Sequence, residues 1–217
     1  MEWPLFAGVP AEDVRRLLSI ARRRTFRKGE VVFHRDDLAE SLLLVVSGRF
    51  AVRITTPLGD SALLDVLGPG DVFGELALLV PDARRSASVE ALEPGETFSV
   101  FRGDFVRLQS EHPGVKDILL RLLAEQLARA SDRIVEAHYV DAETRVRRRL
   151  CELAERYATG EGGAVVPITQ EDLAGLAGTS RATVNRVLRD EEKRGVLELA
   201  RGRTIVGDLN QLRSRSR

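Results

Sequence analysis

Short apolar segments separated by glycines fill residues 25–101 and constrain the fold more than any other feature of this 217-residue sequence. The β-prone runs VVFH, SLLLVVSG, ASVEAL and ETFSVF are each only a few residues long, and Phe50, Val52 and Ile54 alternate with polar or small residues. Many short strands with regular turn signals are typical of a small barrel or roll rather than of a parallel sheet. We therefore expect a small barrel or roll, preceded by a short amphipathic helix over residues 11–24.

A long helix is expected from about Glu111, where the pattern of apolar residues changes. Its apolar residues recur at alternating spacings of three and four, which is the a/d seam of a coiled coil. Such a helix can also lie on the core of its own domain, but its length and strict spacing favour a second copy of the helix as the partner. We therefore expect a parallel homodimer. The seam consists of Leu120, Leu123, Leu127, Ala130, Ile134 and Ala137.

A new helix start follows at Asp141, an acid suited to capping, and a domain boundary is expected at residues 138–142. The chain then has three parts: a roll over 1–110, a dimerisation helix over 111–140 and a C-terminal domain over 141–217. From residue 142 onward, 15 Lys and Arg stand against 11 Asp and Glu, which favours a polyanion as the partner of this part. We expect the basic run RSRSR to be disordered.

The segment ITQEDLAGLAGTSRATVNRVL predicts two short helices around a glycine turn, which is a helix-turn-helix. Thr169 can cap the first helix with Asp172 at the capping-box position, Gly178 makes the turn, and Ser180 or Thr179 caps the second helix. Apolar residues at helical spacing give each helix one buried stripe. These stripes are Leu173, Leu176 and Ala177 on the first helix, and Val184, Val187 and Leu188 on the second.

The outward face of the second helix is basic, and two short strands around Arg201-Gly202-Arg203 would add a wing beside it. Arginines near the helix start can chelate guanine O6 and N7 in the major groove, and hydroxyls can donate to phosphates. A plain helical hairpin with a solvated basic face is the alternative, but cap, turn, basic face and wing together favour DNA. The candidate DNA-contacting residues are Thr169, Ser180, Arg181, Ala182, Thr183, Asn185, Arg186, Arg189 and Arg203.

The loop GELALLVPDARRSA, residues 74–87, places Glu75 and Arg85 at the two ends of one apolar stretch. A surface salt bridge across a turn is one explanation, and a ligand pocket is the other. Arg85 can neutralise a phosphate in a charge-assisted hydrogen bond, and Glu75 can accept hydrogen bonds from ligand hydroxyls. A buried acid and a buried base kept apart would each be costly, whereas a polar ligand between them would satisfy both.

Two motifs, in order and correctly spaced, resemble the cyclic-AMP receptor/fumarate–nitrate regulator (CRP/FNR) family of bacterial transcription factors. The first is Phe73-Gly74-Glu75-Leu76-Ala77-Leu78, followed after six residues by Arg85-Ser86-Ala87. The second is Ser180-Arg181 and Thr183-Val184, then Arg186. The resemblance covers nearly the whole chain and implies an α+β protein with an N-terminal, jelly-roll-like cyclic-nucleotide-binding β-roll, a long dimer helix and a C-terminal winged helix-turn-helix.

The resemblance further implies that residues 74–87 form a phosphate-binding cassette for cyclic AMP or cyclic GMP as the effector, with no cofactor required. It implies double-stranded DNA with an inverted repeat as a partner, and RNA polymerase as a further one. Ala130 stands where the family's cyclic-AMP receptor has a threonine that binds the adenine of the ligand, so the receptor's preference for that base does not carry over. Ala182 stands where the receptor has a glutamate that accepts from a cytosine of the DNA, so its operator sequence does not carry over either. The implied ligand contacts are Gly74, Glu75, Leu76, Arg85, Ser86, Ala87 and Ser131, the serine coming from the partner subunit.

Other functions fit less well. Cys151 is the only cysteine, which excludes a disulfide framework or a cysteine-ligated cluster within one chain, and His34, His112 and His138 lack metal-ligand spacing. We expect no catalytic and no metal site, and, because no membrane-spanning run or secretion signal is found, a cytoplasmic protein. Two alternatives stay open. One is a ligand-independent regulator with a vestigial pocket, and the other a cyclic-nucleotide-binding regulatory subunit of an enzyme, against which the helix-turn-helix argues.

Overall fold

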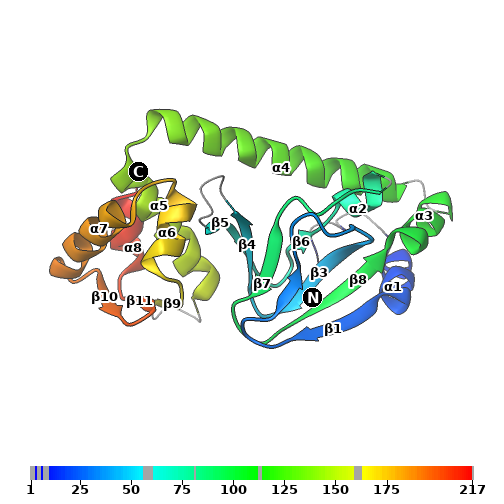
Figure 1. Cartoon of the computed structure of the whole chain (residues 1–217), viewed down its shortest axis with the longest axis horizontal. Helices are drawn as coiled ribbons and strands as arrows, with labels where there is room; N and C mark the ends of the chain where they lie inside the picture. Colours follow the sequence, from blue (N-terminus) through cyan, green and yellow to red (C-terminus); the bar gives the residue numbers. More distant parts are fainter. Residues whose placement is uncertain are drawn as a thin grey trace. The chain divides into compact units, whose positions relative to one another are not determined.

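The computed structural model describes residues 3, 6, 10–55, 61–80, 82–111, 114–158 and 163–216 (Figure 1). The chain divides into two compact units, which are Met1–Ser61 with Asp65–Arg129 and Ala62–Leu64 with Ala130–Arg217. The first unit holds two four-stranded sheets and the second a three-stranded sheet with a helix-turn-helix. The predicted α+β class is confirmed.

Two antiparallel sheets form the β-roll of the first unit. The first sheet has the order β1-β8-β3-β6, with β1 at Arg22–Phe26, β8 at Gly95–Phe101, β3 at Ser41–Ser47 and β6 at Val72–Phe73. The second has the order β2-β7-β4-β5, with β2 at Val31–Phe33, β7 at Ser88–Ala91, β4 at Phe50–Thr55 and β5 at Ser61–Leu67. The predicted roll, rather than a parallel sheet, is therefore present.

Strand β3 is buried on both faces, which explains its continuous apolar run. Leu42 and Leu44 pack into a cluster with Trp3 and the helices of the unit. Leu43 and Val45 point the other way, into a cluster that also takes residues from β2, β4 and β7 and so fills the space between the two sheets. Successive residues of a strand face opposite sides, so a strand covered on both sides needs apolar residues throughout.

The helices of the first unit are α1 (Ala11–Ile20), α2 (Leu76–Leu79), α3 (Arg102–Glu111) and the start of α4 (Gly114–Tyr139). Two sequence predictions are wrong here. The helix expected to reach residue 24 ends at Ile20, because Arg22–Phe26 pairs with β8 as an edge strand that buries only Phe26. The change to helix comes already at Arg102, because Phe105 and Leu108 anchor α3, a helix that we did not predict, in the core. The long helix expected from about Glu111 is present as α4, which begins at Gly114.

The second unit contains the winged helix-turn-helix. Its helices are α5 (Ala142–Tyr157), α6 (Gln170–Ala177), α7 (Arg181–Lys193) and α8 (Leu209–Ser214). The predicted wing is the hairpin of β10 (Leu197–Ala200) and β11 (Arg203–Val206), to which β9 (Ala164–Val166) adds a third strand that we did not predict.

Hydrogen bonds at the helix starts confirm the predicted caps. The Asp141 carboxylate accepts from the backbone N–H of Thr144 at 3.0 Å. Thr169 and Asp172 form the reciprocal capping box of α6, and Gly178 takes the left-handed conformation with φ of 59° at the end of that helix. Ser180, not Thr179, caps α7. The stripe Val184, Val187 and Leu188 is buried as predicted, whereas on α6 Ala174 is buried and Leu176 only half-buried.

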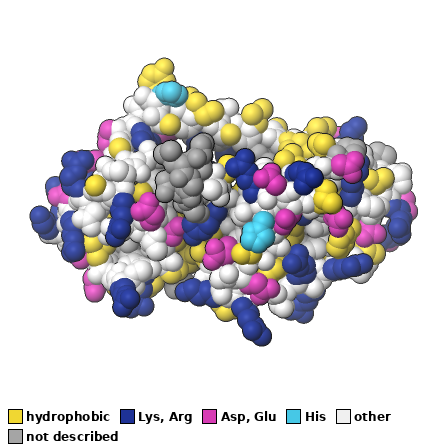
Figure 2. Space-filling view, viewed as in Figure 1, with side chains coloured by type: hydrophobic (Ala, Val, Ile, Leu, Met, Phe, Trp, Pro, Cys, Tyr) yellow, Lys and Arg dark blue, Asp and Glu magenta, His cyan; other side chains and the backbone are white. Residues whose placement is uncertain are grey.

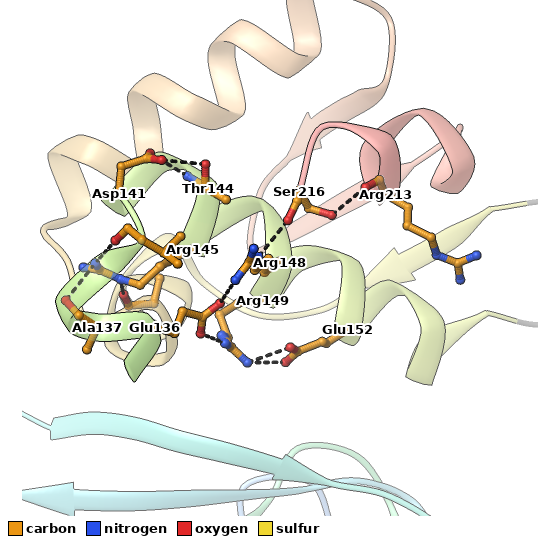
Figure 3. A network of polar contacts seen from close by, with 12 residues as sticks. Glu136, Ala137, Asp141, Thr144, Arg145, Arg148, Arg149, Glu152, Arg213 and Ser216 are labelled. Atoms are coloured by element: carbon orange, nitrogen blue, oxygen red, sulfur yellow. Dashed lines mark hydrogen bonds and ion pairs between the residues drawn. The ribbon is translucent and has the colours of Figure 1, made fainter. Parts of the chain in front are cut away.

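The run RSRSR is not disordered up to Ser216, so this prediction is wrong. Its first two residues, Arg213 and Ser214, end α8, whose Leu212 is fully buried. The guanidinium of Arg213 pairs with Glu155 at 2.6 Å, that of Arg215 pairs with Glu191 at 3.0 Å, and Nε of Arg148 donates to the backbone oxygen of Ser216 at 2.7 Å. Figure 3 shows the segment around Ser216 lying against α5. These partners are distant in sequence, so local composition gave no sign of them.

Candidate functional site

A cavity of about 200 Å³ opens in the first unit beside the loop 74–87, whose Glu75 and Arg85 were expected to bind a ligand. Its apolar lining comes from both sheets and includes Phe33, Val52, Leu67, Phe73 and Val89. Its polar lining is Asp65, Glu75, Arg84, Arg85, Ser86 and Gln126. Gly74, Leu76 and Ala87 also line it, so six of the seven predicted ligand contacts meet in one cavity.

Arg85 is a buried cation with unused hydrogen-bonding capacity. The residue is only 7% exposed, and its Nη1 donates to the backbone oxygens of Ser41 at 2.9 Å and Gly74 at 3.4 Å. The guanidinium carbon lies 4.1 Å from the ring centroid of Phe33, in a cation–π contact. Among the described residues, Nε of Arg85 has no hydrogen-bond partner. A buried, charged donor without a partner is costly, and an anion in the cavity would remove that cost.

The charge of Glu75 acts on Arg85, but the two side chains are not paired. Burial lowers the pKa of the Arg85 guanidinium below its usual value, and the negative charges of Glu75 and Asp37 act in the opposite direction. The ion pairs found in the described part of the chain do not include Glu75 with Arg85. The geometry therefore differs from a salt bridge across a turn, and it leaves the half-buried Glu75 and the buried Arg85 facing one cavity.

Small residues let the backbone come close to this cavity. Gly74 has φ of +78°, and a Cβ there would overlap Nη1 of Arg85 and lie 3.1 Å from the backbone oxygen of Ser41. The hydrogen bonds of the described residues include none donated by the backbone N–H groups of Ser86 and Ala87. Arg85, Ser86 and Ala87 all line the cavity, so these N–H groups and Nε of Arg85 are candidate donors to a ligand.

Helix α4 contributes one residue to the cavity that we did not predict, Gln126. Ser131 is exposed on the same helix, and because its predicted contact is with the ligand of the partner subunit, that contact stays a prediction. Gln126 lies one helical turn before Ala130, the position already singled out for base contact, and residues four apart share a helix face. That spacing is the signal that would have found it.

In the second unit, α6, α7 and the wing surround a second cavity of about 530 Å³. Thr169, Arg181, Asn185 and Arg203 line it, so four of the nine candidate DNA contacts share one groove. The side-chain nitrogen of Asn185 donates to the side-chain oxygen of Gln170 at 3.1 Å, which fixes its amide.

The other five candidates lie on or beside α7, outside this cavity. Ala182, Arg186 and Arg189 are exposed, and the two arginines pair with Glu143 and Glu192, each at 2.9 Å. The hydroxyls of Ser180 and Thr183 lie 3.1 Å apart at the start of the helix. Figure 2 shows Lys and Arg interspersed with Asp and Glu on the viewed face, without a large region of one sign.

Comparison with known proteins identifies both units. Residues 23–112 match the model of the cyclic nucleotide-binding domain, and residues 144–215 match that of the Crp-like helix-turn-helix domain. The chain is 37% identical over 203 residues to the cyclic AMP receptor protein of Thermus thermophilus, covering 94% of this chain and 92% of that protein. The chain belongs to the CRP/FNR family of transcription regulators.

Other CRP/FNR relatives match along almost the whole chain. The CRP-like cAMP-activated global transcriptional regulator of Mycobacterium tuberculosis is 32% identical over 216 residues, covering 98% of this chain and 96% of that protein. The solved structure of the Thermus thermophilus catabolite activator protein is 35% identical, with a TM-score of 0.58 and 98% coverage of both chains. Regulators of this family bind DNA through the helix-turn-helix domain and work as dimers.

The seam of α4 in this CRP/FNR regulator is largely exposed in the single chain. Leu120, Leu127 and Ile134 are 53%, 70% and 60% exposed, and Ala130 and Ala137 are exposed as well. Figure 2 shows hydrophobic side chains along this helix. Leu123 is half-buried. Large apolar side chains exposed at heptad spacing are expected of a helix whose partner is a second copy.

The described residues of this regulator include no group of three or more His, Cys, Asp or Glu that could hold a metal ion. His112, one of the three histidines considered, lies outside the described residues. The helices in the part of the chain that the structure describes include none long and apolar enough to cross a membrane.

Proposed function

We propose that this CRP/FNR regulator is controlled by a cyclic nucleotide, with cyclic AMP as the first candidate and cyclic GMP as the second, and that it needs no other cofactor. Residues 1–110 serve as the sensor, 111–140 as the dimerisation helix and 141–217 as the DNA-binding domain of a cytoplasmic homodimer. The buried Arg85, with Nε lacking a partner beside a cavity, carries the proposal. The cyclic AMP named for the relatives in Thermus thermophilus and Mycobacterium tuberculosis supports the choice of nucleotide.

Each end of the nucleotide has a chemically matching group. The cyclic phosphate carries one negative charge, which Arg85 neutralises while the N–H groups of Ser86 and Ala87 donate to its oxygens. Glu75 accepts from the ribose 2′-hydroxyl, and Gly74 and Leu76 line the sugar. Ser131 of the partner subunit contacts the base. Because Ala130 has no hydroxyl to offer, base recognition is weaker by roughly one neutral hydrogen bond, on the order of 1 kcal/mol.

The DNA partner is an inverted repeat read by the two α7 helices of the dimer, about 34 Å apart, so that both half-sites are contacted on one face. Arg181 and Arg186 bind guanine. Ala182 has no acceptor for the cytosine N4 group, but its methyl group can contact the methyl group of a thymine. The remaining candidates, Thr169, Ser180, Thr183, Asn185, Arg189 and Arg203, position the domain on the backbone or on neighbouring bases. RNA polymerase is a further partner at promoters.

Calorimetry with cyclic AMP and cyclic GMP tests the ligand, and 5′-AMP is the control because it has the same base without the cyclic phosphate. We expect heat of binding for a cyclic nucleotide with the unmodified protein and none with Arg85→Leu, because the variant leaves the phosphate charge uncompensated. Glu75→Gln should weaken binding less, since the shape is kept. A fold control is needed because Arg85 also bonds to Ser41, so each variant must retain its sheet content by circular dichroism.

Selection of bound duplexes from a random library, with and without nucleotide, tests the DNA part. We expect inverted repeats that are enriched more strongly when the nucleotide is present. If operator DNA is bound tightly and neither nucleotide gives heat at millimolar concentration, the protein is a ligand-independent regulator with an unused pocket. Selection of single, non-palindromic sites would contradict binding by a two-fold symmetric dimer.

A further inference from the structure

An acidic residue outside α7 holds one of the arginines that this helix offers to DNA. Oε1 of Glu143, in the first turn of α5, lies 2.9 Å from Nη1 of Arg186. The two side chains are 38% and 68% exposed, so the pair is at the surface and open to a third group. A negative charge beside a DNA-facing arginine opposes binding to phosphates in general, so its presence needs a reason.

Glu143 is anchored from behind by a buried ion pair, which distinguishes it from an ordinary surface partner. Its other oxygen, Oε2, lies 3.6 Å from Nη2 of Arg147, whose side chain is nearly buried. Nε of Arg147 donates to Glu191 of α7 at 2.7 Å, and Glu191 is fully buried. An isolated surface pair leaves both side chains free to move, whereas this carboxylate is attracted to a second cation that is itself bound to a buried carboxylate.

The pair occupies one side of the Arg186 guanidinium and leaves the other side available. The contact is through Nη1, and the described contacts of this guanidinium include no other hydrogen bond or ion pair. Nε and Nη2 lie together on the opposite edge of the guanidinium. Their two parallel N–H groups can donate to O6 and N7 of a guanine. Glu143 and a guanine can therefore bind Arg186 at the same time, on different edges.

We propose that Glu143 is a specificity-determining residue that positions Arg186 for guanine: it binds Nη1 and presents the Nε–Nη2 edge to the base. The inference rests on the proposed role of Arg186 in reading DNA. Holding the guanidinium in one orientation disfavours its swing toward a phosphate, and the carboxylate charge weakens contact with non-matching DNA. Glu143 thus lowers affinity for non-specific DNA and raises the discrimination between guanine and other bases at one position of each half-site.

The test measures Kd by fluorescence anisotropy for three duplexes: a selected operator, the same operator with the G·C pair read by Arg186 replaced, and unrelated DNA. The proteins are the unmodified chain, Glu143→Gln, Glu143→Ala, Arg186→Ala and the double variant Glu143→Ala with Arg186→Ala. Glu155→Gln is the matched control, because it removes the same charge from the same helix and its partner, Arg213, lies on α8. Melting temperatures confirm that the variants are folded.

We expect both Glu143 variants to reduce the ratio of operator to replaced-operator affinity by about two- to fivefold, which corresponds to the energy of a well-placed ion pair. They should also bind unrelated DNA about two- to fourfold more tightly at low salt, since one negative charge is gone. Glu155→Gln should leave the ratio unchanged. In the Arg186→Ala background, Glu143→Ala should cause no further loss of discrimination.

The inference is overturned if folded Glu143 variants discriminate as well as the unmodified protein, or if they lose discrimination equally when Arg186 is absent. Failure of the proposed function has a different signature. Arg186→Ala would then discriminate as well as the unmodified protein, or no duplex would be preferred at all.

Discussion

Gly74→Ala tests whether Arg85 is packed as tightly against its loop as the geometry requires. Two separate costs are expected. The backbone at Gly74 has φ of +78°, and an alanine in the left-handed region costs about 1–2 kcal/mol. The new Cβ would also overlap Nη1 of Arg85 and approach the backbone oxygen of Ser41, an overpacking that typically costs about 1–3 kcal/mol. The free energy of unfolding should therefore fall by about 2–5 kcal/mol.

Two other glycines of the same unit separate these costs. Gly29 has φ of +80°, and its Cβ would meet only the end of the Glu90 side chain at 4.0 Å, so Gly29→Ala should show the backbone cost alone, about 1–2 kcal/mol. Gly103 lies in α3 with nothing within 4 Å of its Cβ, so Gly103→Ala should be neutral or stabilise by up to about 1 kcal/mol.

Urea unfolding followed by tryptophan fluorescence is the assay, because Trp3 is the only tryptophan and is buried in the core of the first unit. Its indole N–H donates to the backbone oxygen of Val45 on β3, so the signal reports on the sheet that carries the cavity. If Gly74→Ala and Gly29→Ala lower stability equally, Arg85 is not held against Gly74 and the account of the cavity is wrong.

Three further predictions follow from the helices. Leu127→Glu should turn the dimer into monomers in sedimentation velocity, whereas Ala128→Glu, off the seam, should not; a dimeric Leu127→Glu would refute the seam. Asp141→Ala should lower the free energy of unfolding by about 1 kcal/mol at neutral pH. Hydrogen bonds from Thr144 hold the pKa of Asp141 below its usual value, so the stabilisation by Asp141 is present above the unfolded pKa and is lost as the pH falls through the folded pKa. If urea titrations show the same stability difference between the unmodified protein and Asp141→Ala in acid as at neutral pH, this reasoning is wrong. Ala130→Thr should tighten cyclic AMP in calorimetry by up to about tenfold and cyclic GMP less; equal changes would argue against base contact at this position.

The features predictable from sequence were those with local physical causes. The caps at Asp141, Thr169 and Ser180 each depend on a side chain and a backbone N–H three residues away, so a short window contains the whole interaction. The stripe of α7 likewise repeats within one helix. The loop 74–87 was found because Glu75 and Arg85 are near each other in sequence as well as lining one cavity.

The features that sequence reasoning missed depend on distant partners. The first three residues of β1, Arg22–Arg24, were included in the predicted helix 11–24, although pairing with β8 makes them a strand. The spacing of Gln126 from Ala130 places the two residues on one face of α4, but the contact of that face with the roll depends on residues distant in the sequence. The ion pair between Glu143 and Arg186 joins two helices far apart in the chain, and a lone acid gave no sign of it.

The pairing of Arg215 with the buried Glu191 has a consequence for protein synthesis. Glu191 is on α7, so a chain interrupted before Arg215 already carries every proposed DNA contact. It lacks one cationic partner of a fully buried carboxylate, and leaving a buried charge under-compensated is strongly destabilising. Prematurely terminated copies should therefore be removed by cellular proteases instead of competing with intact protein for promoters.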